Sequence, residues 1–357
     1  MIDDRSLNRA LLARQHLLAR VSLPPLAMVE HLVGLQAQEP QDPYVGLWTR
    51  IDGFDPADLG AAVAGRAAVR IALQRSTIHL VTAADCLALR PVLQPVLERQ
   101  ARSMFGKRLV GVDLAELAAA TRELVTAEPP AFGRLGTLLQ QRWPDRDPTA
   151  LAVTARALVP LVQLPPRGVW GRGGRALHAT VESWLGAPTG GDPAPDRLVL
   201  RYLAAFGPAT VADVQNWSGL TRLAEVVDRL RPSLLCDRAA DGRELLDLPD
   251  SPRPDPGTPA PARFLPQYDN VLLGHADRSR IVPPGAAGLF DQQFHWSPLL
   301  VDGMLRGVWR RDGGILHVRA PRLSAAERDE VTAAGAALLA LLAPDRVPDV
   351  RLAPASG

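Results

Sequence analysis

Two glutamines, Gln36 and Gln38, are separated only by Ala37 and follow directly on a hydrophobic segment. Pro40 favours an extended backbone for the residue before it. In an extended segment the two amides point to one face and Ala37 to the other. Each amide can donate and accept hydrogen bonds, so the pair could orient a water molecule or bind the edge of a base. The alternative is a solvated helix end that carries ordinary polar residues.

Other polar side chains near this motif also have two interpretations. Glu39 and Asp42 could act as a base, or they are solvated loop acids. His79 lies in a β-rich run with Thr77 on the same face. These two residues either support the chemistry of the glutamines or belong to an ordinary core.

The sequence lacks the patterns of several other catalytic classes. The seven histidines are scattered and the two cysteines, Cys86 and Cys236, are far apart, so we expect no metal site and no disulfide. Neither a phosphate loop nor a nucleophilic serine motif is present, and we expect no cofactor. Lys107 is the only lysine among 40 basic residues, which argues against a Schiff-base lyase step.

Charge and hydropathy restrict the compartment and the partners. The net charge of +2 does not by itself indicate nucleic-acid binding. The chain has no apolar run of about 18 residues and no signal-peptide pattern at Met1, so we expect a cytoplasmic protein with no membrane partner. Because no heptad segment favours dimerisation, we expect a monomer.

Helices followed by strand pairs recur along the chain, which predicts an α+β, mainly helical fold built from three tandem winged-helix units. The first unit is expected to contain helices over 6–20, 24–34, 56–64 and 84–102, with strands over 69–73 and 77–81. The second is expected to contain helices over 114–126, 132–143 and 148–159, followed by a Gly- and Arg-rich loop over 165–175. The third is expected to contain helices over 196–206, 210–217 and 221–230, with a hairpin over 233–236 and 244–248.

The remainder of the chain begins with a proline-rich linker over 251–261. A strand and loop are expected to follow, and then a hairpin over 303–309 and 315–319. Ser324 is expected to cap a last helix that ends at Leu342, and residues 347–352 could return as a strand. The resulting boundaries are 1–110, 111–190 and 191–250 for the three units, 251–261 for the linker, and 262–357 for a C-terminal β/α region.

Arginines are concentrated in two segments that we expect to protrude. The C-terminal hairpin carries Arg306, Arg310, Arg311 and Arg319, and the loop over 165–175 includes Arg167 and Arg172. These side chains could contact DNA phosphates or simply be solvated. The third helix of the third unit carries Glu225 and Asp228 beside its arginines, so a scaffold role suits it better than reading a DNA groove.

Three sequence segments together resemble the winged-helix DNA glycosylases of the AlkZ/YcaQ family, and the resemblance covers nearly the whole chain. The segments are Gly34-Leu35-Gln36-Ala37-Gln38, Thr77-Ile78-His79-Leu80-Val81 and Arg263-Phe264-Leu265-Pro266-Gln267-Tyr268-Asp269-Asn270. The resemblance implies tandem winged helices that form a concave DNA-binding scaffold. It also implies that Gln36-Ala37-Gln38 is the active-site motif in its two-glutamine version, which resembles the subgroup linked to self-resistance against DNA-alkylating natural products.

The resemblance implies a monofunctional DNA glycosylase without lyase activity, acting on double-stranded DNA with N7-alkylated or crosslinked guanines. An N7-alkylated guanine is already cationic and leaves as a neutral base, so positioning of water and of the sugar would be the main requirement. We expect the amide oxygens of Gln36 and Gln38 to fill that role. We also expect the protein to associate with the nucleoid when it binds DNA. The alternative is a non-catalytic winged-helix DNA-binding protein, either a regulator or a resistance protein.

Overall fold

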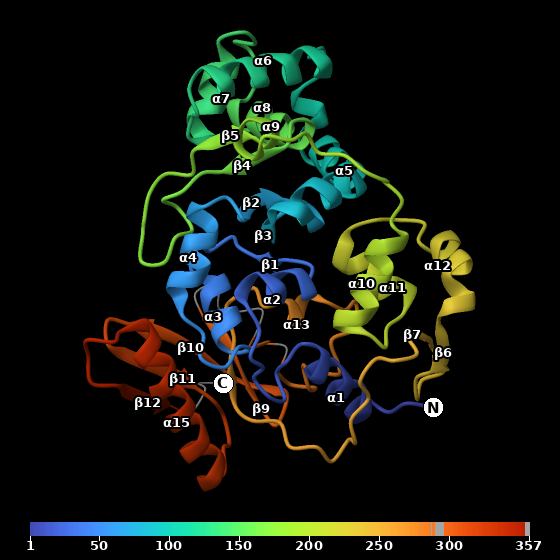
Figure 1. The fold of residues 1–357 in the computed structure, drawn as a ribbon, viewed down its shortest axis with the longest axis vertical. Helices are drawn as coiled ribbons and strands as arrows, with labels where there is room; N and C mark the ends of the chain where they lie inside the picture. The colour runs from blue at the N-terminus through green and yellow to red at the C-terminus, as the bar shows by residue number, and fades with distance from the viewer. Residues whose placement is uncertain (287, 290–295, 354–357) are drawn as a thin grey trace.

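The computed structural model describes residues 1–286, 288–289 and 296–353 and has an α+β fold. An antiparallel sheet with the strand order β1-β3-β2-β4-β5 lies at its centre (Figure 1). These strands are β1 (Leu35–Gln36), β2 (Ala68–Ala72), β3 (Ile78–Thr82), β4 (Leu161–Gln163) and β5 (His178–Thr180). Helices cover both faces of β2, so all five of its residues are buried.

Five helices surround strands β1, β2 and β3 of this sheet and share one core with them. They are α1 (Asp4–Arg14), α2 (Pro25–His31), α3 (Asp42–Trp48), α4 (Pro56–Ala64) and α5 (Ala83–Phe105). Thr82 ends β3 and also caps α5, because its side chain accepts a hydrogen bond from the backbone N–H of Asp85. The position of β3 therefore fixes where the long helix α5 starts.

A second helical group lies at the far end of α5, at the top of Figure 1. It consists of the 3-10 turn Gly106–Arg108 and the helices α6 (Leu114–Ala127), α7 (Phe132–Gln140), α8 (Pro148–Leu158) and α9 (Val181–Leu185). Asp113 and Asp147 cap α6 and α8 through hydrogen bonds from backbone N–H groups. The group has a core of its own, which includes Leu117, Leu135 and Leu151.

The third group follows the helix-turn-helix pattern. It contains α10 (Asp196–Phe206), α11 (Val211–Ser218), α12 (Ala224–Leu230), the 3-10 turn Arg231–Ser233 and the hairpin of β6 (Leu235–Arg238) and β7 (Glu244–Asp247). Thr210 and Asp213 form a reciprocal cap at the start of α11, and Gly219 ends that helix in the left-handed conformation.

A second five-stranded sheet forms the C-terminal part, with the order β12-β11-β10-β9-β8. Its strands are β8 (Arg263–Phe264), β9 (Ser297–Val301), β10 (Met304–Asp312), β11 (Ile315–Arg319) and β12 (Asp349–Ala353). The short helix α13 (Asn270–Leu273) follows β8, and the long helix α15 (Ala325–Leu342) packs on the sheet. Ser324 and Glu327 cap α15 reciprocally, which confirms the helix start expected at Ser324.

The α+β class, the helices over 56–64 and 196–206, the Arg-rich hairpin and the final strand agree with the sequence predictions. Three predicted helix bounds are wrong because the backbone turns left-handed near their ends. The first helix stops at Arg14 before His16, the second stops at His31 before Val33 and Gly34, and the third unit's last helix starts at Ala224 after Arg222.

The first two predicted units are joined more closely than we expected. Strands β4 and β5 come from the second predicted unit but extend the sheet of the first, through antiparallel pairing of β4 with β2. The sequence pattern did not reveal α3, β5 or β9, which are short or follow irregular segments. Within the described residues, no helix is long and apolar enough to cross a membrane.

Candidate active site

A tight turn carries the chain from α2 into the glutamine motif. Gly34 has φ of +91°, and a Cβ atom there would lie 2.7 Å from Val81 Cγ1 and 3.1 Å from the Leu80 carbonyl oxygen. Only glycine fits such a conformation and such a contact. The Asn270 side chain donates to the Gly34 carbonyl at 2.7 Å, so the segment after β8 holds this turn in place.

The motif itself continues along the edge of the central sheet. Gln36 pairs with His79 on β3, and the Ala37 N–H donates to the Ile78 carbonyl at 2.7 Å. Ala37 is fully buried, and its carbonyl accepts a hydrogen bond of 2.6 Å from the buried guanidinium of Arg70. The middle position of the motif therefore serves the core, while the two glutamines flank it.

Both glutamine carbonyls are occupied inside the protein. Gln36 Oε1 accepts a hydrogen bond of 2.9 Å from Arg75 Nη2, and Gln38 Oε1 accepts one of 3.1 Å from the Ile78 backbone N–H. A guanidinium and a backbone N–H can only donate, so these contacts fix which end of each amide is oxygen. Within the described part of the chain, neither NH₂ group has a hydrogen-bond partner.

This orientation adds a structural role to the glutamine oxygens that the sequence did not predict. The amide oxygens were predicted to steady water and sugar, whereas the structure uses those oxygens to hold the motif. Gln36 is 8% exposed and Gln38 lies exposed at the end of the motif. Each NH₂ group can therefore donate to a substrate, and each carbonyl oxygen keeps a second lone pair.

Arg75 is a site residue that the sequence reasoning missed. It lies in the 3-10 turn Gln74–Ser76 between β2 and β3, where Arg75 and Ser76 have φ of 52° and 61°. Its second amino group donates to the Trp217 carbonyl at 2.5 Å, at the end of α11. Burial and the nearby Arg278 lower the pKa of Arg75 to about 10, so it stays charged at neutral pH. The only sequence signal was an arginine between two strand-like runs.

Thr77 and His79 lie beside Gln36 and support its surroundings. His79 Nδ1 donates to the Thr77 carbonyl at 3.0 Å, and Thr77 Oγ1 donates to the Gln74 carbonyl at 3.0 Å. Burial, followed by the charge of Arg75, lowers the pKa of His79 to about 3. His79 is thus a neutral and almost fully buried neighbour of Gln36.

The segment after β8 packs against α3, close to the acidic residues Glu39 and Asp42 that follow the motif. Arg50 and Asp269 form a bidentate ion pair with both side chains fully buried, at 2.7 and 2.8 Å. Asp42 starts α3, and its Oδ2 is buried without a hydrogen-bond partner. Burial, followed by the nearby charge of Glu39, raises the pKa of Asp42 to about 7.

Two of the predicted DNA-binding arginines meet at one cavity. Arg172 of the Gly-rich loop and Arg311 at the end of β10 both line a cavity of about 380 Å³, together with Trp170 and Gln41. Gln41 connects this loop to the motif, because its side chain donates to the Val169 carbonyl and accepts from the Gly171 N–H, both at 3.1 Å. The cavity therefore begins three residues beyond Gln38.

The other four arginines are not brought to that cavity. Arg310 and Arg319 lie over the ring of Trp296, at 4.9 and 4.2 Å from its centroid. Arg306 lies 3.7 Å from Glu327, and Arg167 donates to the Gly174 carbonyl within its own loop at 3.1 Å. Of the predicted set, Arg172 and Arg311 therefore line this cavity, and Gln41 is the lining residue that connects it to the segment after the motif.

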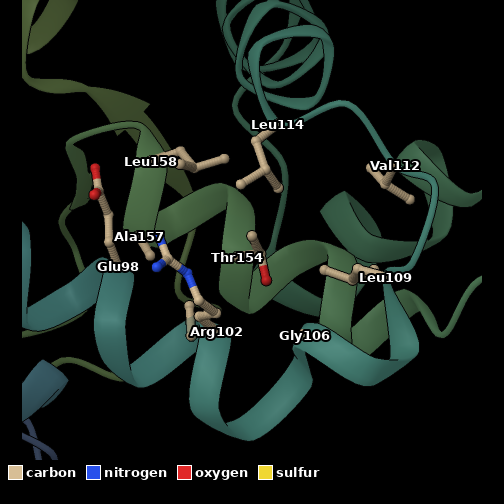
Figure 2. Close-up of a pocket in the computed structure, with 10 residues that line it drawn as sticks. Glu98, Arg102, Gly106, Leu109, Val112, Leu114, Thr154, Ala157 and Leu158 are labelled. Atoms are coloured by element: carbon tan, nitrogen blue, oxygen red, sulfur yellow. The ribbon is translucent and has the colours of Figure 1, made fainter.

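A separate cavity of about 410 Å³ lies between α5, α6 and α8 (Figure 2). Leu109, Leu114 and Leu158 make its lining largely apolar, and Glu98 and Arg102 are its charged residues. It belongs to the second helical group and contains no residue of the glutamine motif. In the described residues, no cluster of three or more His, Cys, Asp or Glu could hold a metal ion.

A comparison with family models identifies the family of this chain, and a comparison with solved structures identifies a similar fold. Residues 29–341 match the family model described as DNA glycosylase AlkZ-like. The fold resembles the solved structure of Streptomyces sahachiroi DNA glycosylase AlkZ with a TM-score of 0.78 and 19% sequence identity, covering 99% of this chain and 100% of that one. No curated protein matches the chain in sequence.

Proposed function

Because the chain belongs to the AlkZ-like DNA glycosylase family, we propose that it hydrolyses the N-glycosidic bond of N7-alkylated purines in double-stranded DNA. The observation that supports this proposal is the pair of fixed amides, each with its carbonyl held and its NH₂ group without a partner among the described residues. Gln36 and Gln38 are the residues to which we assign the chemistry.

The proposed substrate needs little activation. An N7-alkylated purine carries a positive charge and leaves as a neutral base, so the site does not have to protonate it. One amide N–H can hold a water molecule through one lone pair, which leaves the second lone pair for attack on C1′. The other amide can hold a sugar or phosphate oxygen of the same nucleotide. Removing an oriented group of this kind typically lowers the rate about 10² to 10³-fold.

We extend the proposal to purines in interstrand crosslinks. A crosslinked nucleotide cannot rotate fully out of its duplex into an enclosed pocket. Gln38 is exposed at the edge of the sheet, which favours a site that a bulky lesion can approach. Self-resistance to a DNA-alkylating natural product would follow from such a substrate, and the sensitivity of a deletion strain to that product tests this part.

We also propose that the product is an abasic site in an intact strand. Lys107, the only lysine, lies in the turn after α5, and the length of this helix places it on the order of 30 Å from β3. The N-terminal segment pairs through Ile2 with Ala239, beside the β6–β7 hairpin rather than the motif (Figure 1). The distance of these two amines from the motif supports a reaction without a lyase step. We propose that the protein acts as a monomer and needs no cofactor.

Single-turnover release of N7-methylguanine from a labelled duplex tests the proposal. Wild type should release the base, and Gln36→Ala/Gln38→Ala should bind DNA and fold normally but lose release. If wild type is inactive on this monoadduct and on a nitrogen-mustard crosslink, yet binds DNA, the protein is a DNA-binding member without glycosylase activity.

A further inference from the structure

Building on the proposed function, we propose that Asp42, with Glu39 beside it, accepts the proton of the attacking water. When water attacks C1′, the new C1′–O bond forms as the C1′–N9 bond breaks. The bonding electron pair goes to the cationic base, which departs neutral, and the water proton must go to an acceptor. The Asp42 carboxylate accepts this proton and becomes a carboxylic acid, which completes the balance of atoms and charge.

The glutamines cannot take this proton themselves. Their NH₂ groups are donors, and their carbonyl oxygens already accept from Arg75 and the Ile78 N–H. An amide oxygen is also a very weak base. The motif can therefore position a water molecule but needs a separate base.

Asp42 is half-buried as a whole, with one buried oxygen, and it differs from the fully buried carboxylates described in this structure. Asp85, Asp247 and Asp269 each form an ion pair with an arginine, at distances of 2.5 to 2.7 Å. Among the described residues Asp213 has no such ion pair, but both of its carboxylate oxygens accept hydrogen bonds, from Thr210 and from the Ala276 N–H. Asp42 forms no ion pair with a described residue, and its Oδ2 is buried without a partner. A carboxylate with a buried oxygen and no cationic partner is costly, and in a chain with dozens of arginines the lack of an ion pair points to a task in the site.

The surroundings place Asp42 at the end of the glutamine motif. The Asp42 N–H donates to the Glu39 carbonyl at 3.2 Å, so a single turn leads from the motif into α3. One helical turn later, a Cβ at Gly46 would contact Pro266 at 3.5 Å and Leu35 of β1 at 3.8 Å. Because Asp42 shares that face of α3, its carboxyl faces the backbone N–H groups of Gln267 and Tyr268.

The electrostatics of this site suit a base that works near neutral pH. The groups that face the carboxyl are Glu39 and Asp269, which raise its pKa, and the N–H groups of Gln267 and Tyr268, which lower it; burial makes the largest contribution, and the resulting pKa is about 7. Burial, Glu39 and Asp42 raise the pKa of Tyr268, which therefore stays protonated. A general base is most effective when its pKa lies near the working pH.

His79 is the competing base, and its properties argue against it. It pairs with Gln36 across the strands, but it is only 2% exposed and its pKa of about 3 makes it a weak acceptor. A rate governed by His79 would not change between pH 5 and 9.

The test is the pH dependence of single-turnover base release by the full chain. Wild type should lose rate about tenfold per pH unit below an inflection near pH 7 and show a plateau above it. Asp42→Asn should lower the plateau about 10²-fold and abolish the inflection. Glu39→Gln should move the inflection to lower pH, because the neighbouring negative charge is gone. The matched control is Asp52→Asn, an exposed acid beyond α3, which should keep the wild-type profile.

Each outcome separates this inference from the proposed function. If wild type releases base and Asp42→Asn keeps both the wild-type rate and the inflection, Asp42 is not the proton acceptor, although the glycosylase proposal stands. If wild type releases no base, the proposed function itself fails. An Asp42→Asn variant that is folded but inactive, together with an unshifted inflection in Glu39→Gln, would assign Asp42 a structural role only.

Discussion

Replacing Asp42 by asparagine should stabilise the protein at alkaline pH while impairing its activity. Burial and Glu39 raise the pKa of Asp42 from 3.8 to about 7, so the folded state binds a proton that the unfolded state releases. Folding stability should then fall as pH rises from about 4 to about 7 and level off above that, because the charged carboxylate is costly to keep buried. Asparagine has nearly the same shape and carries no charge.

The size of this effect follows from the shift in pKa. A change from 3.8 to about 7 corresponds to an upper limit of about 4 kcal/mol, at 1.36 kcal/mol per unit. Since Asp42 is only half-buried, solvent screens part of this penalty, and we expect about 2 kcal/mol in favour of Asp42→Asn at pH 8. At pH 5 the difference should be smaller than about 1 kcal/mol.

Urea unfolding of wild type and Asp42→Asn at both pH values measures this difference directly. The other titrating groups are common to the two proteins, so the change in the difference between pH 5 and pH 8 reports Asp42 alone. An equal difference at both pH values, or a variant less stable than wild type at pH 8, would show that the carboxylate is well solvated or paired, and our reasoning about this site would be refuted.

Three further predictions concern the supports of the site. Arg75→Ala should lower the single-turnover rate about 10- to 100-fold with little change in DNA affinity, because Gln36 Oε1 loses its donor; a rate equal to that of wild type would contradict this role. Arg172→Ala/Arg311→Ala should weaken DNA binding and reduce the slope of log K against log salt by roughly 2 in a fluorescence anisotropy titration, and an unchanged slope would exclude phosphate contacts at their shared cavity. Arg50→Ala should cost about 3 to 5 kcal/mol in urea unfolding, since Asp269 would remain buried without its partner, whereas a loss below about 1 kcal/mol would mean that water replaces the guanidinium.

Local signals in the sequence were sufficient for much of the fold. Ser324 followed by Glu327 is a helix start because the two side chains satisfy each other's backbone N–H groups, and the structure contains that cap. The hairpin expected over 233–236 and 244–248 is present as β6 and β7, and its turn contains Asp241-Gly242, a pair typical of hairpin turns, with a positive φ at Gly242. Such features depend on residues only a few positions apart.

Long-range features of the site could not be derived in this way. The contact of Arg75 with Gln36 joins residues 39 positions apart. It depends on the left-handed backbone of Arg75 and Ser76, which the sequence does not indicate because neither residue is a glycine. Asp42 forms no ion pair with a described residue, whereas Arg50, just beyond the end of the same helix, pairs with Asp269, 219 positions away. The amide orientation could not be predicted for the same reason, since only the folded chain shows which donors reach the carbonyls.

The segment from Arg263 to Asn270 shows what the sequence could indicate and what it could not. Its resemblance to the family drew attention to the segment, but not to what it does. In the structure Asp269 holds Arg50 and Asn270 holds the Gly34 carbonyl, so the segment clamps α3 and the turn before the motif. A role as a clamp becomes visible only when both partners are placed.

The most direct test of the central claim is single-turnover release of N7-methylguanine by wild type and by Gln36→Ala/Gln38→Ala at equal DNA saturation. Our account predicts release by wild type, an intact strand until heat or alkali is applied, and loss of release in a double variant that still folds and binds DNA. Release by the double variant at the wild-type rate would place the chemistry elsewhere in the protein and contradict the account.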